Sequence, residues 1–223
     1  TYSKLFAKSG FSVIYLQSNI NLLHWFSKKG YYNTWKEGSR FINNIWVTCA
    51  LSLIPYYDKS SFFSNKIIRF SYKLCLPSIR KLILKSGYGE PDIIWTTIPG
   101  SSVLKELFPK AKLIFHCIDN YATYRGKQIA NVELEDYKKS DHVFVIGDVL
   151  KKHVFSLIKR EKKITNLGQG VNIKLYQNNY KIPDDLKNIS GPIAIWVGVL
   201  EKFDKLYLKF LAKSLKKRKG SVV

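Results

Sequence analysis

The chain has 223 residues, of which 46% are hydrophobic, and it carries a formal net charge of +21. This length fits one domain, or one domain and part of a second. The hydrophobic content is high enough to bury a core, which excludes intrinsic disorder as the main description of the chain. The charge favours anionic partners, namely nucleic acid, acidic lipid headgroups or phosphorylated substrates, although a lysine-rich solvated surface would explain it equally well.

Two further features of the composition bear on chain ends and compartment. The sequence contains no methionine, even at position 1, and it stops at 220–223, which resembles the start of a strand after a basic helix. We therefore expect both ends to be cut. The three cysteines, Cys49, Cys75 and Cys117, are odd in number and widely spaced. This spacing predicts neither a disulfide framework nor a zinc site, and it favours a reducing cytosol.

Apolar runs rich in β-branched and aromatic residues alternate along the chain with amphipathic runs, and they predict strands and helices respectively. Strands are expected over 11–16, 45–53, 91–97, 112–117, 142–146, 163–167 and 193–198. Helices are expected over 64–85 with a kink or break at Pro77, from 101 or 102 to 108, over 132–140, over 148–158 with Asp148 as the cap, and over 204–219. This alternation predicts an α/β fold with a doubly wound, Rossmann-like parallel sheet.

The sequence also indicates how the chain is divided. Residues 181–192 are rich in proline, glycine and polar residues, as is typical of a linker. We expect a first domain over 1–180, this linker, and the first strand–helix unit of a truncated second domain over 193–223. The basic amphipathic patterns at 64–85 and 204–219 would suit an anionic membrane surface, although an ordinary outer helix explains the second one better.

The best candidate for chemistry lies where the strand expected at 112–117 ends. Ligands of parallel α/β sheets bind at the carboxyl ends of the strands, and Asp119 follows this strand. Asp119 could take a proton from an acceptor hydroxyl, and His116 could tune or assist it. The alternative is that Asp119 caps a turn and that His116 is a packed, hydrogen-bonded core residue.

A second candidate is the turn formed by Pro99, Gly100, Ser101 and Ser102, which also follows an expected strand. Its backbone amides lie at an expected helix start, where they could bind an anion or a sugar hydroxyl. The histidines have no metal-ligand spacing, and no D-x-D, Walker A, H-E-x-x-H or G-x-S-x-G sequence occurs. The glycines near 168–170 form only a partial dinucleotide fingerprint. We therefore expect neither a metal nor a cofactor.

Five motifs follow one another along the chain. They are PDIIW at 91–95, FHCIDNY at 115–121, SDHVFV at 140–145, GQGVN at 168–172 and IWVGVL at 195–200. This ordered set resembles the two-domain, Rossmann-like (GT-B) glycosyltransferases. The likeness is closest to bacterial enzymes of the teichuronic-acid and xanthan glucuronosyltransferase type, which build surface polysaccharides, and it covers most of the chain from about residue 90 to 212.

The resemblance implies an N-terminal acceptor domain and a C-terminal domain that binds a nucleotide-sugar. It implies metal-independent transfer of the sugar to a lipid-linked or other glycan acceptor, with Asp119 as the catalytic base. Gly170 matches a glycine in the turn before the second domain, and Gly198 matches one near the donor phosphates. Many relatives have a second acidic residue where this chain has Asn120. The residues expected around the bound substrate are Pro99, Gly100, Ser101, Asn120, Tyr121 and Arg125.

An enzyme of this kind would lie in the cytoplasm, peripheral to the inner face of the cell membrane, where lipid-linked acceptors reside. Without the rest of the donor domain, we expect the chain to be inactive alone. Two other functions stay open. One is a basic nucleic-acid-binding α/β protein, although no RNA- or DNA-reading motif occurs and no nucleic acid is expected. The other is a glycosyltransferase-like scaffold without catalytic activity.

Overall fold

The computed structural model describes residues 2–17, 20–21, 33, 35–54, 64–125, 127–178, 180–189, 191–198 and 204–222, without the side chains at 124, 125, 127 and 128. The chain divides into two compact units, Thr1–Gln169 and Gly170–Val223. Each unit is described by itself. The expected linker lies within the second unit, where it includes a short helix, α10 (Asp184–Lys187). The expected division at 180 and 193 stays a prediction.

The centre of the first unit is a four-stranded, all-parallel sheet with the order β10-β9-β8-β7. Parallel pairing puts the carboxyl ends of neighbouring strands at one edge, with Thr96 beside Phe115 and Cys117 beside Val145. The strands are β7 (Ile93–Thr96), β8 (Lys112–Cys117), β9 (His142–Val145) and β10 (Ile164–Asn166).

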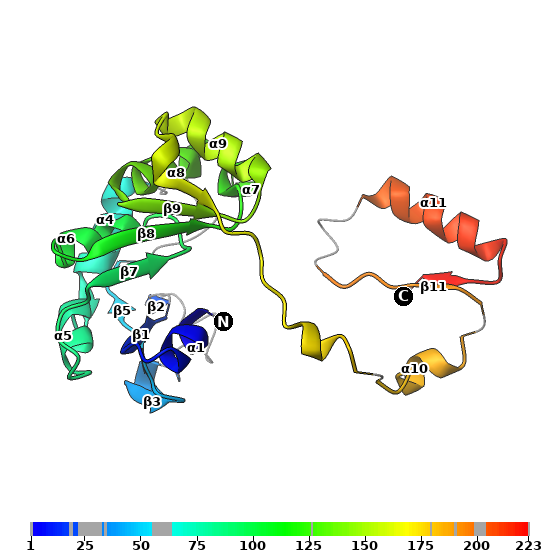
Figure 1. The fold of residues 1–223 in the computed structure, drawn as a ribbon, viewed down its shortest axis with the longest axis horizontal. Coiled ribbons are helices and arrows are strands. Elements are labelled where there is room, and N and C mark those ends of the chain that lie inside the picture. The colour runs from blue at the N-terminus through cyan, green and yellow to red at the C-terminus, as the bar shows by residue number, and fades with distance from the viewer. Residues whose placement is uncertain are drawn as a thin grey trace. The chain divides into compact units, whose positions relative to one another are not determined.

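Helices cover one face of this sheet, because its strands follow one another in chain order and right-handed crossovers then fall on the same side. In Figure 1, α8 and α9 lie along that face. The buried cluster beneath them consists of Phe115, Cys117, Tyr137, Val143, Val145, Val154 and Ile164. The connecting segments are η1 (Ser101–Val103), α6 (Leu104–Leu107), α7 (Tyr121–Arg125), α8 (Lys127–Lys139) and α9 (Asp148–Ile158), with η2 (Glu161–Lys163) before β10.

The opposite face of the sheet carries aromatic side chains. The ring of Trp95 stacks on Phe144 at a centroid distance of 5.2 Å. Helix α1 (Tyr2–Lys8) adds Tyr2 and Phe6, each with its ring centroid 5.5 Å from that of Trp95. The side chains of β8 alternate between the two faces, so His116 lies on this aromatic face and its neighbours Phe115 and Cys117 on the other.

The described part of the rest of the first unit includes small mixed sheets and the helices α4 and α5, whose bounds follow. In one sheet β4 pairs parallel with β1 and antiparallel with β3, and in the other β5 pairs parallel with β2 and antiparallel with β6. The elements are β1 (Val13–Leu16), β2 (Ile20–Asn21), β3 (Arg40–Ile42), β4 (Ile45–Thr48), β5 (Leu51–Ser52), α4 (Asn65–Lys73), β6 (Cys75–Leu76) and α5 (Ile79–Leu84).

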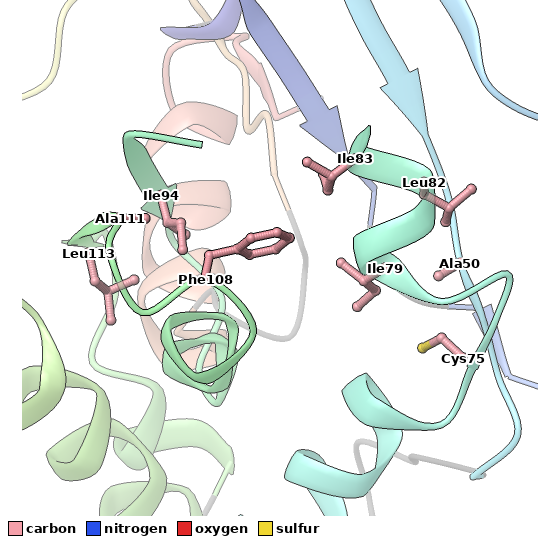
Figure 2. Close-up of a cluster of buried hydrophobic side chains, with 9 residues drawn as sticks. All are labelled: Ala50, Cys75, Ile79, Leu82, Ile83, Ile94, Phe108, Ala111 and Leu113. Carbon is pink, nitrogen blue, oxygen red and sulfur yellow. The ribbon is translucent and has the colours of Figure 1, made fainter. Parts of the chain in front are cut away.

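One buried cluster connects these small sheets with the four-stranded sheet. In Figure 2 the ring of Phe108 points from its loop toward Ile79 and Ile83 of α5. Burying such apolar side chains contributes about 1.5–3 kcal/mol each, so this cluster is a main source of cohesion. The cluster consists of Ala50, Cys75, Ile79, Leu82, Ile83, Ile94, Phe108, Ala111 and Leu113, with Ile14 and Leu16 packed against it.

The second unit contains one strand–helix–strand motif. Its strands, β11 (Ile193–Ala194) and β12 (Ser221–Val222), pair in parallel, and α11 (Lys205–Lys216) connects them. Asp204 caps α11 by accepting the N–H of Leu206 at 2.8 Å. The unit also contains η3 (Ile173–Leu175).

The structure confirms an α/β fold with a parallel sheet and corrects several expected elements. The break expected at Pro77 is confirmed, since the segment 64–85 forms α4 and α5, but the strand β6 between the two helices was not expected. The helix expected to begin at 132 begins at Lys127. Asp148 does not cap α9: the cap is Gly147, and the Asp148 carboxylate instead accepts a hydrogen bond from Asn166 at 2.8 Å. In the ranges given above, no helix is both long and apolar enough to cross a membrane.

Candidate functional site

The candidate site lies at the edge of the four-stranded sheet where β7, β8 and β9 end. Because the three strands are parallel, the turn after β7 and the loop after β8 start at the same edge. The first contains Pro99–Ser102, and the second contains Asp119 and Asn120. The sequence-based proposal that both features belong to one site is therefore consistent with their placement.

The turn after β7 is held by a carboxylate from α8. Asp136, which is fully buried, accepts hydrogen bonds from the backbone N–H of Gly100 at 2.6 Å and of Ser102 at 3.0 Å. Within the turn, the hydroxyls of Thr96 and Ser101 are 2.5 Å apart. The amides expected to bind an anion or a sugar hydroxyl thus already have an intramolecular acceptor. A substrate-binding role for Pro99, Gly100 and Ser101 stays a prediction.

A second carboxylate of the same helix holds the loop after β8. Glu133 accepts the N–H of Tyr121 at 3.3 Å and the N–H of Ala122 at 3.2 Å, which are donors of the first turn of α7. The hydroxyl of Tyr137 also donates to Glu133, at 3.1 Å, and lies 3.3 Å from the sulfur of Cys117. One helix therefore fixes both loops at this edge.

Sequence reasoning missed Glu133 and Asp136, although α8 contains a signal for them. Its buried positions recur at the three- and four-residue spacing of one helix face, and the two acids lie within that stripe. Acidic side chains are rarely buried without partners, so acids on a buried stripe indicate hydrogen-bonded anchors. The buried positions are Ile129, Val132, Glu133, Asp136, Tyr137 and, just after the helix, Ser140.

Burial sets the protonation of these anchors. It raises the pKa of Asp136 to about 7, although the hydrogen bonds from Ser102 and Gly100 act in the opposite direction. It also raises the pKa of Glu133 above the ordinary carboxyl value, against the hydrogen bonds from Tyr137, Tyr121 and Ala122. Burial likewise raises the pKa of the Cys117 thiol to about 11, so this cysteine is no ready nucleophile at neutral pH.

Asp119 is half-buried and lies between the end of β8 and the start of α7, and its backbone carbonyl is 3.4 Å from the sulfur of Cys117. Asn120 precedes α7, and its carbonyl accepts the N–H of Thr123 at 3.1 Å. The side-chain oxygen of Asn120 is buried and has no hydrogen-bond partner in the described part of the chain. Tyr121 packs against a cluster containing Ile68. The backbone of Arg125 ends α7, and its side chain lies outside the described residues.

His116 is a packed residue with 1% of its surface exposed. Its ring centroid lies 5.2 Å from that of Tyr2 and 5.5 Å from that of Trp95. Neither ring nitrogen has a hydrogen-bond partner in the structure as described, so His116 is not hydrogen-bonded to Asp119. Burial lowers the pKa of His116 below its ordinary value and favours the neutral ring. Its assistance to Asp119 stays a prediction.

The two glycines expected to bind the donor lie in the second unit. Gly170 is exposed and begins that unit. Gly198 has a φ of +155°, and a Cβ there would lie 3.4 Å from the indole of Trp196. A side chain at 198 would therefore have a strained backbone conformation, while its Cβ would be in ordinary contact with this ring. The donor-binding roles of both residues stay predictions.

Within the described ranges, no group of three or more His, Cys, Asp and Glu side chains is placed to hold a metal ion. No family model matches the chain, and a search of curated proteins found no match either.

Proposed function

We propose that the chain belongs to a glycosyltransferase that moves a sugar from a nucleotide-sugar donor to a glycan acceptor during surface-polysaccharide synthesis. The first candidate for this acceptor is a lipid-linked glycan. The proposed fold is the doubly wound, Rossmann-like arrangement of the GT-B type. The buried cluster supports it, because it brings Ile14 and Leu16 of β1 into contact with a core that contains Ile94 of β7.

The observation that carries the proposal is the position of Asp119. Its carboxylate follows β8 at the edge where ligands of parallel α/β sheets bind, and Glu133 anchors the adjoining turn of α7. A base must be held in place to accept a proton in the transition state, and a loop pinned at its next turn meets this need. Asp119 is half-buried, so part of the residue is exposed to solvent.

In the proposed reaction, Asp119 accepts the proton of an acceptor hydroxyl. The oxygen attacks the anomeric carbon of the donor sugar, and the bond between that carbon and the nucleotide diphosphate breaks. The electron pair leaves with the diphosphate. The resemblance described above implies that this transfer needs no metal, and it assigns the donor to the second unit, with Gly170 and Gly198.

The proposed location is the cytoplasmic side of the cell membrane, with the protein bound peripherally. The net charge of +21 supports this location, because each basic residue near an anionic membrane surface contributes about 1 kcal/mol of attraction. Flotation with vesicles that contain or lack anionic lipid measures it. Equal, weak binding to both vesicle types would contradict it.

The test of the proposed function is Asp119→Asn in the intact protein. We expect kcat for transfer from a panel of nucleotide-sugars to fall by about 10²–10⁴-fold, the usual contribution of general-base catalysis. Asp92→Asn is the matched control, because Asp92 is exposed and precedes β7 at the opposite edge of the sheet. Near wild-type turnover of Asp119→Asn would remove this residue from the mechanism. Salt-sensitive oligonucleotide binding without nucleotide-sugar binding would favour the nucleic-acid alternative.

A further inference from the structure

A small cavity with basic walls lies between α4, η1 and α8, beside the turn after β7. Its volume is about 80 Å³, and its lining includes Lys66 and Arg69 of α4, Gly100 of the turn, Glu106 of α6, and Glu135 and Lys139 of α8. Neither the reaction proposed above nor the sequence motifs use these charged side chains.

The charges around this cavity do not balance. The Glu106 carboxylate is contacted by Arg69 Nε at 2.9 Å, by Lys73 Nζ at 3.0 Å and by Lys139 Nζ at 3.5 Å. Lys139 also pairs with Glu135. Partial burial pushes the pKa of Glu106 up, but the hydrogen bond from Lys73 and the surrounding cations outweigh it and lower the pKa.

Lys66 adds a fourth positive charge to this group and has no ion-pair partner within the described ranges. The lining holds three cations, Lys66, Arg69 and Lys139, and two carboxylates, Glu106 and Glu135. With Lys73, which contacts Glu106 from outside the lining, the group carries an excess of two positive charges. Repulsion among cations held this close is relieved only in part by the carboxylates. An anion with two negative charges would neutralise the excess.

A close approach of two backbone segments brings these cations to the turn. Gly100 has a φ of +87°, and a Cβ there would lie 2.6 Å from Cγ2 of Ile68, which is 2% exposed. Ile68 therefore packs directly on the turn. This packing places two neighbouring residues of α4, Lys66 and Arg69, in the lining of the cavity.

We infer that this cavity is a binding site for a phosphate-class anion, with Lys66, Arg69 and Lys139 as the contacting groups. Arg69 meets Glu106 through Nε, whereas a guanidinium has five N–H donors in a fork that suits phosphate oxygens. Lys66 supplies a point charge of the kind that commonly binds phosphate. The site does not depend on the transfer reaction. A free phosphate and a lipid phosphate headgroup present the same chemistry to it.

The test is a titration of the whole chain with pyrophosphate at low salt. Calorimetry and ³¹P NMR measure the binding. We expect the double variant Lys66→Gln/Arg69→Gln to weaken binding about tenfold or more, because removing one charge-assisted hydrogen bond costs about that factor. The matched control is Lys152→Gln/Arg160→Gln, which removes the same two charge types from exposed positions at and after α9. The control should bind as the wild type does. Equal weakening in both doubles, or no binding by the wild type, would overturn the site.

Glu106→Gln tests the same site with the opposite sign and does not depend on how the double variant folds. This change removes the carboxylate that competes with a bound anion for three cations, so pyrophosphate should bind more tightly than to the wild type. Weaker or unchanged binding by Glu106→Gln would show that the cations serve only to join the helices, and it would overturn the site.

Vesicles distinguish the two sources of the anion. Binding to phosphatidic acid vesicles but not to phosphatidylcholine vesicles, abolished in Lys66→Gln/Arg69→Gln and displaced by pyrophosphate, identifies a lipid headgroup as a ligand. Binding of pyrophosphate with no such vesicle binding identifies a free phosphate ligand. Vesicle binding that survives in the double variant would place membrane contact elsewhere and would contradict the headgroup assignment.

Discussion

The Asp136 carboxylate accepts the backbone N–H of Gly100 at 2.6 Å, across 36 residues of sequence. Its second oxygen accepts the N–H of Ser102 at 3.0 Å. Helix α8 therefore supplies the cap for the segment that follows β7, which has no side-chain cap of its own. Both oxygens of this buried carboxylate therefore accept a backbone N–H, which a contact at the surface would not provide.

Asp136→Ala should lower the free energy of unfolding by about 2 kcal/mol or more, because two buried amides lose their acceptor at about 1–3 kcal/mol each. Urea unfolding followed by circular dichroism measures the change. Glu135→Ala is the control on the same helix: Glu135 is half-buried and pairs only with Lys139 in the described structure, so its loss should cost about 1 kcal/mol or less. Equal losses from both variants would argue against the capping role.

Glu133→Ala and Asp136→Ala should leave different marks in amide hydrogen exchange. Without Glu133 the amides of Tyr121 and Ala122 lose their acceptor and should exchange faster, while those of Gly100 and Ser102 stay protected. Asp136→Ala should give the reverse pattern. Faster exchange at both loops in either variant would mean that the helix as a whole had loosened, and it would contradict separate anchors.

Because His116 is buried and its pKa is lowered, we expect its protonation in acid to destabilise the fold. Its folded-state pKa is depressed by burial below the value near 6.5 of the unfolded chain, so the unfolded state binds the proton more readily. The contribution of His116 to stability is therefore present above about pH 6.5 and is lost as the pH falls. Asp136 acts with the opposite sign: its pKa is raised to about 7, so its contribution is present below about pH 4 and is lost as the pH rises through 7.

The variant His116→Phe isolates the histidine. It removes two buried nitrogens without partners, keeps a ring against Tyr2 and Trp95, and should be close to neutral at pH 8. Between pH 7 and pH 5 it should become progressively more stable than the wild type. A constant difference between His116→Phe and the wild type across this range would show that His116 does not titrate on unfolding.

Gly100→Ala should destabilise the first unit by more than Gly89→Ala. Both glycines have φ near +80 to +87°, so both replacements carry the same backbone strain. Only at Gly100 does the added Cβ meet a side chain, Ile68 at 2.6 Å, whereas Gly89 faces open space. Thermal unfolding measures the difference. Ile68→Ala removes both atoms that the added Cβ would meet most closely, so in that background the extra cost of Gly100→Ala should fall toward that of Gly89→Ala. An unchanged extra cost would mean that the clash lies elsewhere.

The local sequence pattern was sufficient to predict the elements in which the pattern of apolar residues matches the surroundings in the fold. The expected bounds of β8, at 112–117, are those observed. Helix α9 ends at Ile158 as expected, although it begins at Asp148, the residue that was expected to cap it. In β8 an apolar run meets buried surroundings, since its residues from Phe115 to Cys117 are all buried. In α9 a helical period of apolar residues begins directly after a strand. In both cases the local signal and the tertiary environment agree.

The features that sequence reasoning missed depend on partners far away in the chain. Strand β6 exists because Cys75 and Leu76 pair with β5, more than twenty residues earlier. The caps from Glu133 and Asp136 join residues 11 to 36 positions apart. The position of Asp119 at the edge of the sheet followed from the strand before it, whereas the missing hydrogen bond to His116 follows from the face on which β8 places that ring.

The arrangement of α8 has a consequence for any redesign of this edge. Glu133 and Asp136 are three residues apart on one rigid rod, and each residue of an α-helix turns the next by about 100°. A single residue inserted between them would rotate one carboxylate away from the amides that it accepts, while the other carboxylate kept its hydrogen bonds. Exchanging either loop for that of another protein would therefore require the helix to be transplanted with it.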